Sequence, residues 1–190
     1  MTIRKFGPIL AAAAALLLSA CSMVAPKYVF SVDQVQTLRD AGLAPAKIGA
    51  VGAAGADAHN DSIALRGSGM HSPYGNYARY LQVALAQDLR EARLLDEKSD
   101  VEINAVLLKN DIDTGMATAS ADIAARFVVS KAGQTRFDRT KTAHIEWDSN
   151  FIGAIAIPRA QEHYPVLVAA LLKELYADGE FLRALKPGGP

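Results

Sequence analysis

The chain has 190 residues and carries equal numbers of basic and acidic side chains, 20 of each. Hydrophobic residues make up 51% of it, enough for one core of domain size. Because there is no surplus of Lys and Arg and no basic run with interleaved aromatic residues, the composition argues against nucleic acid as a partner. The single cysteine, Cys21, excludes a disulfide within one chain.

The N-terminal residues have the order of an export signal. Arg4 and Lys5 precede an apolar segment that runs from Ile9 to Ala20, which is 12 residues long. A transmembrane helix requires about 20 apolar residues, so this segment is too short to span a bilayer. We therefore expect residues 1–20 to be a signal peptide that is removed.

Four residues at the end of this segment, Leu18, Ser19, Ala20 and Cys21, resemble the lipobox that bacterial type II signal peptidase recognises. The resemblance implies cleavage before Cys21 and acylation of that residue, with Leu18, Ser19 and Ala20 as the recognition residues. Several acyl chains anchor a protein durably, whereas one binds only marginally. In this family pattern an Asp after the cysteine favours retention in the inner membrane. The residue here is Ser22, so the resemblance favours the outer membrane, facing the periplasm.

The remaining chain divides into three parts. Residues 21–30 are predicted to be the lipidated cysteine and a short tether, residues 31–185 an α+β domain in the periplasm, and residues 186–190 a flexible tail. The part of the tether from Ser22 to Lys27 spans only about 20 Å when extended, at ~3.4 Å per residue. The domain is therefore expected to lie close to the bilayer.

The first half of the domain is predicted to be helix, strand, long loop and helix. Ser31 and Gln34 have the spacing of a capping box, and Gly42 marks the end of this first helix. Residues 46–54 are expected to form a strand, and residues 55–76 a long loop with one short strand near 62–66. Apolar residues recur every three or four positions over 76–95, which predicts the strongest helix.

Three strands and a C-terminal helix complete the expected domain. Apolar and polar residues alternate over 101–107, 119–129 and 137–147, and Ala132 to Gln134 provide a hairpin turn. The last helix is expected from about Pro158, with Pro165 as a kink or restart. The predicted fold is α+β: one domain with an antiparallel or mixed sheet of three to five strands and two main helices on one face.

No catalytic or metal-binding motif emerges from the residues. The four histidines have no metal-ligand spacing, and a G-x-S-x-G elbow fails because Arg66 stands where its first glycine belongs. We therefore expect no metal, no cofactor and no enzymatic activity. The loop that contains Met70, His71 and Tyr74 is interpreted as a candidate contact loop.

The apolar run from Phe151 to Ile157 follows the third strand. We interpret it as core and crossover, because seven consecutive residues contain no charge. If part of this run were exposed, it would instead mark a contact site.

With the lipobox and this layout, the chain resembles small YajG-type lipoproteins and, more loosely, the auxiliary lipoproteins of envelope ABC transporters. The lipobox carries the specific match, while the layout over residues 76–185 is shared with unrelated folds. The resemblance implies a membrane-anchored, non-enzymatic accessory subunit that binds an envelope protein. Two alternatives stay open: a module that carries a lipid or small ligand, and, less favoured, a hydrolase built around His71 and the carboxylates.

Overall fold

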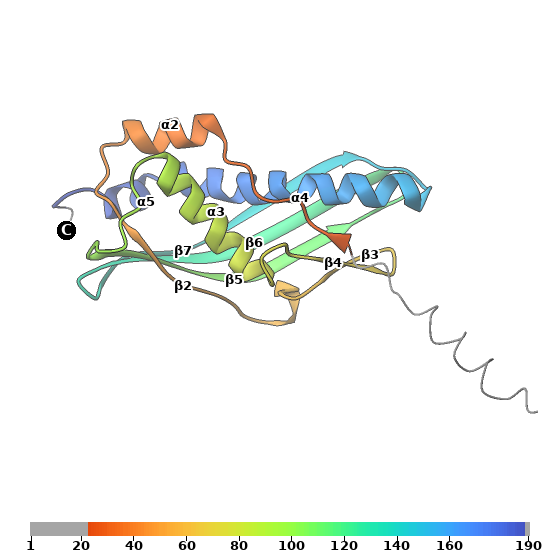
Figure 1. The fold of residues 1–190 in the computed structure, drawn as a ribbon, viewed down its shortest axis with the longest axis horizontal. Helices are drawn as coiled ribbons and strands as arrows, with labels where there is room; N and C mark the ends of the chain where they lie inside the picture. Colours follow the sequence, from red (N-terminus) through yellow and green to blue (C-terminus); the bar gives the residue numbers. More distant parts are fainter. Residues whose placement is uncertain (1–22, 189–190) are drawn as a thin grey trace, which may run out of the picture.

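The computed structural model describes residues 23–188 (Figure 1). The four residues of the predicted lipobox lie outside them. The elements along the chain are β1 (Met23–Val24), α2 (Val32–Asp40), β2 (Lys47–Ala53), the 3-10 turn η2 (Ala56–Ala58), β3 (Ile63–Leu65), β4 (Ser68–His71), α3 (Tyr77–Glu91), β5 (Val101–Asp113), β6 (Thr118–Lys131), β7 (Gln134–Asp148), α4 (Gly153–Tyr176) and α5 (Gly179–Ala184).

The strands form two sheets. The larger has the order β2-β5-β6-β7, in which β2 pairs with β5 in parallel and the other neighbours are antiparallel. The smaller has the order β1-β4-β3, with β1 parallel to β4. The predicted α+β class, with a mixed sheet in a single domain, is confirmed.

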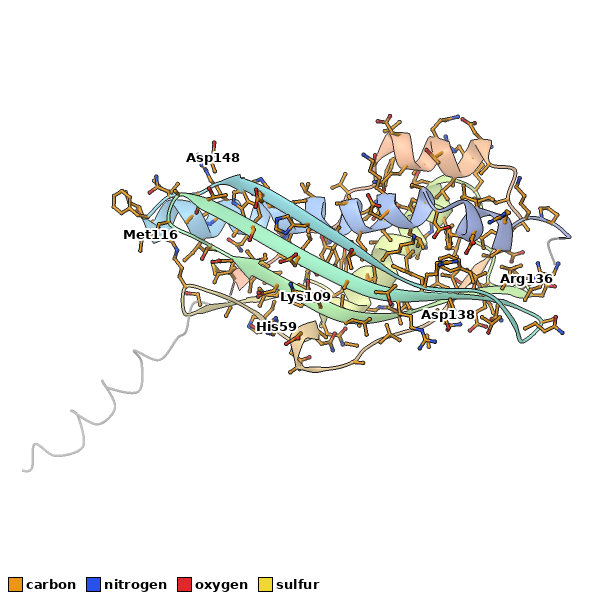
Figure 2. All side chains as sticks on the ribbon, turned by 180° about the vertical axis from the view of Figure 1, so that it is seen from behind. His59, Lys109, Met116, Arg136, Asp138 and Asp148 are labelled. Atoms are coloured by element: carbon orange, nitrogen blue, oxygen red, sulfur yellow. The ribbon has the colours of Figure 1, made fainter. Side chains whose placement is uncertain are left out.

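Helices α3 and α4 lie across one face of the large sheet, and Figure 2 shows its other face open. The alternation in β6 explains this arrangement, because every second side chain from Ala119 to Val129 is buried while those between face solvent. Apolar side chains recur at helical spacing in α3 and α4 and pack on the buried face. The sheet thus has a dry face and a wet face, as the alternation predicted.

The first helix begins after Ser31, as predicted, but not through a capping box. The Ser31 side chain makes no capping hydrogen bond, although the residue has the extended backbone of an N-cap. Gln34 instead reaches across to α4, where its amide donates to the carbonyl of Ala169 at 2.9 Å. The residue that sequence reasoning assigned to local capping therefore ties two helices together.

The C-terminal helix is longer than predicted. It begins at Gly153 rather than near Pro158, and it continues through Pro165 without a break. Each internal proline removes a backbone donor, yet Tyr164, Leu167 and Leu171 are all buried against the rest of the core. The packing of this stripe outweighs the two missing hydrogen bonds.

The predicted long loop over 55–76 is largely structured. The expected short strand is β3, but η2 and β4 were not predicted. β4 was missed because its sequence, Ser-Gly-Met-His, has little strand propensity. It forms because β3 and β1 pair with it on either side.

Candidate functional site

The residues that follow Cys21 are packed on the domain, in contrast to the tether expected over 21–30. Met23 and Val24 pair with Met70 and His71, and the Ala25 amide donates to the carbonyl of His71 at 2.8 Å. Ala25 and Tyr28 are buried. The chain is therefore held by the domain from the second residue after Cys21 onward.

Two side chains from the helices also hold this segment. The Tyr80 hydroxyl on α3 donates to the carbonyl of Pro26 at 2.8 Å. The Gln161 amide on α4 donates to the carbonyl of Val24 at 3.2 Å. The segment thus lies against both main helices, and its position is tied to theirs.

A buried carboxylate completes the attachment. The hydroxyls of Tyr28 and Tyr176 both donate to Asp88, at 3.0 Å each to Oδ2, and Asp88 is fully buried. Burial raises the pKa of Asp88 to about 6, although the two tyrosine hydrogen bonds act to lower it. Burial raises the pKa of Tyr28 and of Tyr176 as well, so both remain donors. One carboxylate therefore joins the N-terminal segment, α3 and α4.

The three residues of the candidate contact loop make their contacts within this chain. Met70 is fully buried, and its carbonyl accepts from the Tyr77 hydroxyl at 2.8 Å. The Nδ1 of His71 lies 2.9 Å from the carbonyl of Asp61, and Tyr74 packs edge-on against Tyr80. Met70 and His71 also form the strand on which residues 23–25 lie.

An apolar surface is exposed at one end of the large sheet. We call it the apolar end, and it comprises the side chains of Met116, Phe151, Ile152 and Ile155 with the loops 114–117 and 149–152. The exposed fractions are 80% for Met116, 75% for Phe151, 44% for Ile152 and 39% for Ile155. Figure 2 shows Met116 at this end and Arg136 at the opposite one. The interpretation of residues 151–157 as core is therefore wrong for its first residues.

Arg66 organises the two loops of the apolar end. Its guanidinium donates to the carbonyls of Thr114 (2.7 Å), Gly115 (3.0 Å), Asn150 (2.7 Å) and Phe151 (2.8 Å). The rigid fork of five donors in arginine suits such an arrangement, which lysine cannot reproduce. Sequence reasoning treated Arg66 only as a mismatch to a hydrolase motif. The sequence offers only Gly67 as a sign of the tight β3–β4 turn, in which Arg66 and Gly67 both have positive φ.

The wet face of the large sheet carries ion pairs. His144 lies between Asp122, at 3.0 Å, and Glu146, at 3.3 Å, and the hydrogen bond that its ring donates to the Asp122 carboxylate is the main cause that raises the His144 pKa. Lys109 also pairs with Asp122 at 3.2 Å. Within residues 23–188 no group of three or more His, Cys, Asp or Glu side chains has the geometry to hold a metal ion.

The opposite end of the molecule is charged. We call it the charged end, and it comprises the side chains around α5: Arg136, Arg139, Asp178, Glu180, Arg183 and Lys186. Arg139 pairs with Glu180, and Asp178 pairs with Lys141 of β7 at 2.6 Å. A cleft of about 470 Å³ lies here, lined in part by Arg136, Arg183 and Lys186.

No protein-family model matches the chain, and no curated protein matches it in sequence. Solved structures do resemble it. A Xanthomonas campestris protein of family DUF330 has 12% identity and a TM-score of 0.51, over 80% of this chain and 92% of that one. A candidate lipoprotein from Caulobacter crescentus CB15 has 13% identity and a TM-score of 0.43, over 83% of this chain and all of that one. The first likeness concerns the fold alone.

Among the helices of the described residues, none combines the length and the hydropathy that a bilayer crossing requires.

Proposed function

We propose that the chain is a bacterial envelope lipoprotein, anchored through Cys21 in the outer membrane, facing the periplasm, and acting as a non-enzymatic accessory or binding subunit. The observation that carries the proposal is the order Leu18-Ser19-Ala20-Cys21 immediately before β1. A cleavage site for lipidation at this point leaves only Ser22 between the acylated residue and the folded domain.

The attachment of residues 23–28 supports this reading. A lipoprotein with a long free linker can sample a wide zone above the membrane. Here the backbone pairing with β4 and the burial of Tyr28 hold the segment on the domain. The domain of such a lipoprotein would stay at the membrane surface, where a partner would have to be a neighbouring envelope component.

Nothing in the described residues supports either alternative function, the ligand carrier or the hydrolase. The cleft at the charged end and a second one, between Ile48 of β2 and Arg79 and Arg90 of α3, both carry several charged side chains, which do not suit an apolar ligand such as a lipid. A hydrolase around His71 lacks support because, among the described residues, the ring hydrogen-bonds only to the backbone carbonyl of Asp61, and no carboxylate or hydroxyl forms a hydrogen bond with it. We therefore retain the accessory role as the proposed function.

The test of the anchor is metabolic labelling with a fatty acid in the native host. Wild type should take up the label, and Cys21→Ala should lose it and accumulate as the unprocessed precursor. Ser22→Ala is the matched control and should be labelled as wild type is. Processing and release of Cys21→Ala at the wild-type rate would contradict the proposal.

The membrane to which the protein is sorted and the protein that it binds are tested by separate measurements. Ser22→Asp should shift the protein from the outer-membrane to the inner-membrane fraction on a density gradient, while labelling stays unchanged. Crosslinking in intact membranes, followed by purification of the full lipoprotein, should recover a reproducible envelope protein. Recovery of nothing reproducible would count against the accessory role, without bearing on the anchor.

A further inference from the structure

The apolar end gathers four of the eight large apolar side chains that the described residues expose. We propose that Met116, Phe151, Ile152 and Ile155 insert into the interface of the same bilayer that holds the lipid on Cys21. The inference rests on the proposed lipidation of Cys21 and adds to it a second, protein-borne contact that sets how the domain is oriented on the membrane.

Strand register places the N-terminal attachment at this end. β1 runs parallel to β4, with Met23 opposite Met70, so the direction from Met23 toward the N-terminus corresponds to the direction from Met70 toward Ser68. That direction leads to the β3–β4 turn, which carries Arg66. Figures 1 and 2 both show the β1-β4-β3 sheet in the half of the molecule that contains the apolar end.

Chain length then limits the separation. Two residue steps join Cys21 to Met23, so the two Cα atoms lie within about 7 Å of each other. Arg66, at the end of the adjacent hairpin, contacts both loops of the apolar end directly. A bilayer that holds Cys21 is therefore within reach of these loops.

Several backbone groups of the two loops at the apolar end already have hydrogen-bond partners within the protein. Peptide groups that lose water without a replacement partner cost several kcal/mol each in a bilayer. Arg66 satisfies four carbonyls here, the Ser149 amide donates to Ala117 at 2.7 Å, and the Ile152 amide donates to the Asn150 side chain at 2.8 Å. Much of the cost of dehydrating these loops is thus already met within the protein.

Arg66 itself suits the depth of the lipid headgroups. Its donors point at neutral carbonyls, so its positive charge is not cancelled by those contacts. Arginine at a membrane boundary places its charge among the phosphates while its stem lies along apolar surface. The guanidinium would then lie at phosphate level, with Phe151 and Met116 reaching past it.

The size of the surface favours a bilayer over a protein. A stable protein interface buries about 800 Å² on each partner. Four partly exposed side chains supply only a few hundred Å², which lies within the usual range of a single apolar patch. Interfacial insertion needs no more than this, since apolar side chains enter the headgroup boundary by only ~5–10 Å.

The test uses the complete mature lipoprotein in vesicles of phosphatidylethanolamine and phosphatidylglycerol. Cys21 is the only cysteine, and its sulfur would be a thioether, so an introduced cysteine becomes the single reactive thiol. An environment-sensitive fluorophore is attached to Met116→Cys or Phe151→Cys, and to Gln134→Cys in the hairpin turn at the other end of the sheet as the matched control. The vesicles contain lipids brominated on their acyl chains, which quench only a fluorophore that reaches them.

We expect bromolipid quenching at least threefold stronger for labels at 116 and 151 than for the label at 134. Equal, weak quenching at all three positions would overturn the insertion. So would a blue shift at 151 that depends on protein density and is not accompanied by quenching, because it would mean that a second copy covers this end.

A mass measurement on the N-terminal peptide of the same sample separates the two proposals. A lipid on Cys21 together with unquenched labels at 116 and 151 would overturn the insertion and leave the lipoprotein assignment intact. An unmodified Cys21 would overturn both, since the inference depends on the anchor.

Discussion

The two ends of the large sheet are built from different chemistry. At the apolar end, Arg66 is directed at backbone carbonyls, and four large apolar side chains are exposed beside it. At the charged end, cations meet carboxylates: Arg139 pairs with Glu180 and Lys141 with Asp178. At one end backbone carbonyls are paired with an arginine and the four large exposed side chains are apolar. At the other end charged side chains pair with one another.

This difference gives the molecule a direction. If the apolar end faces the bilayer next to Cys21, the charged end and its cleft point away from the membrane. An ion-pairing surface interacts well with water and with polar partners, but poorly with acyl chains. The charged end would then be the part of the domain that meets other envelope components.

The largest effect is expected where the N-terminal segment is fixed between these ends. Asp88→Ala leaves the Tyr28 and Tyr176 hydroxyls buried without an acceptor, which costs about 3 kcal/mol of unfolding free energy. Urea unfolding measures the loss. Tyr28→Phe, which removes one donor and leaves the other, is the control and should cost about 1 kcal/mol. Equal stability of wild type and Asp88→Ala would contradict the role assigned to this carboxylate.

The same carboxylate predicts a pH dependence. Its pKa is about 6 in the folded protein and ~3.9 in an unfolded chain, so between these values the folded state retains a proton that the unfolded state has released. Stability should therefore fall as pH rises from about 4 to about 6, by about 2–3 kcal/mol, and then level off. Asp88→Asn should remove this part of the slope in urea midpoints measured over pH 4–7. A slope that is identical in the variant would assign the effect to other groups.

Replacing Arg66 at the apolar end should lower the unfolding free energy by less than Asp88→Ala does. Arg66→Ala leaves four carbonyls at the rim of the domain to be solvated by water, so the expected loss is about 1–2 kcal/mol. Arg66→Lys should not recover it fully, because a point charge cannot serve two loops at once. Hydrogen exchange should report faster exchange at the Ser149 and Ile152 amides in both variants. Unchanged exchange would mean that the loops hold their shape without Arg66.

The sequence predicted the regular parts of this molecule because their signals are local. The alternation from Ala119 to Val129 and the helical stripe of α3 each appear within a single segment, and the structure agrees with both. The Ala132-Gly133 turn was found for the same reason, since both residues adopt positive φ. Local periodicity was therefore a sufficient guide to the sheet and its covering helices.

The parts that bear on function depend on contacts across long sequence distances. Residues 23–28 looked like a tether because their partners, His71, Asp88 and Gln161, are far away in the chain. Arg66 looked like a failed motif because its acceptors lie about 50 and 85 residues later. No pattern within one segment records such pairings, so the attachment and the apolar end became visible only in the fold.

At the charged end, the pair between Lys141 and Asp178 offers a smaller and more selective change. Asp178 also accepts from the Glu180 amide at 2.7 Å and so caps α5. Asp178→Asn keeps the cap and removes the ion pair, which should cost no more than about 1 kcal/mol. Asp178→Ala removes both and should cost roughly 1 kcal/mol more. Thermal unfolding at low and high salt separates the two contributions. The loss in Asp178→Asn relative to wild type should shrink at high salt, because the ion pair is screened, whereas the further loss in Asp178→Ala should not.

The smallest effect on stability, and the sharpest contrast between the ends, is expected for Phe151→Ser. The side chain is 75% exposed, so its removal takes little apolar area out of the core, and the unfolding free energy should stay within about 0.5 kcal/mol of wild type. If Phe151 were held in place for packing, the variant would be destabilised and its membrane contact incidental. Unchanged urea unfolding, together with weaker bromolipid quenching of a label at position 116, would show that the side chain serves the bilayer and not the fold. A stable variant whose label at 116 is quenched as before would remove Phe151 from the membrane contact and leave Met116 to account for it.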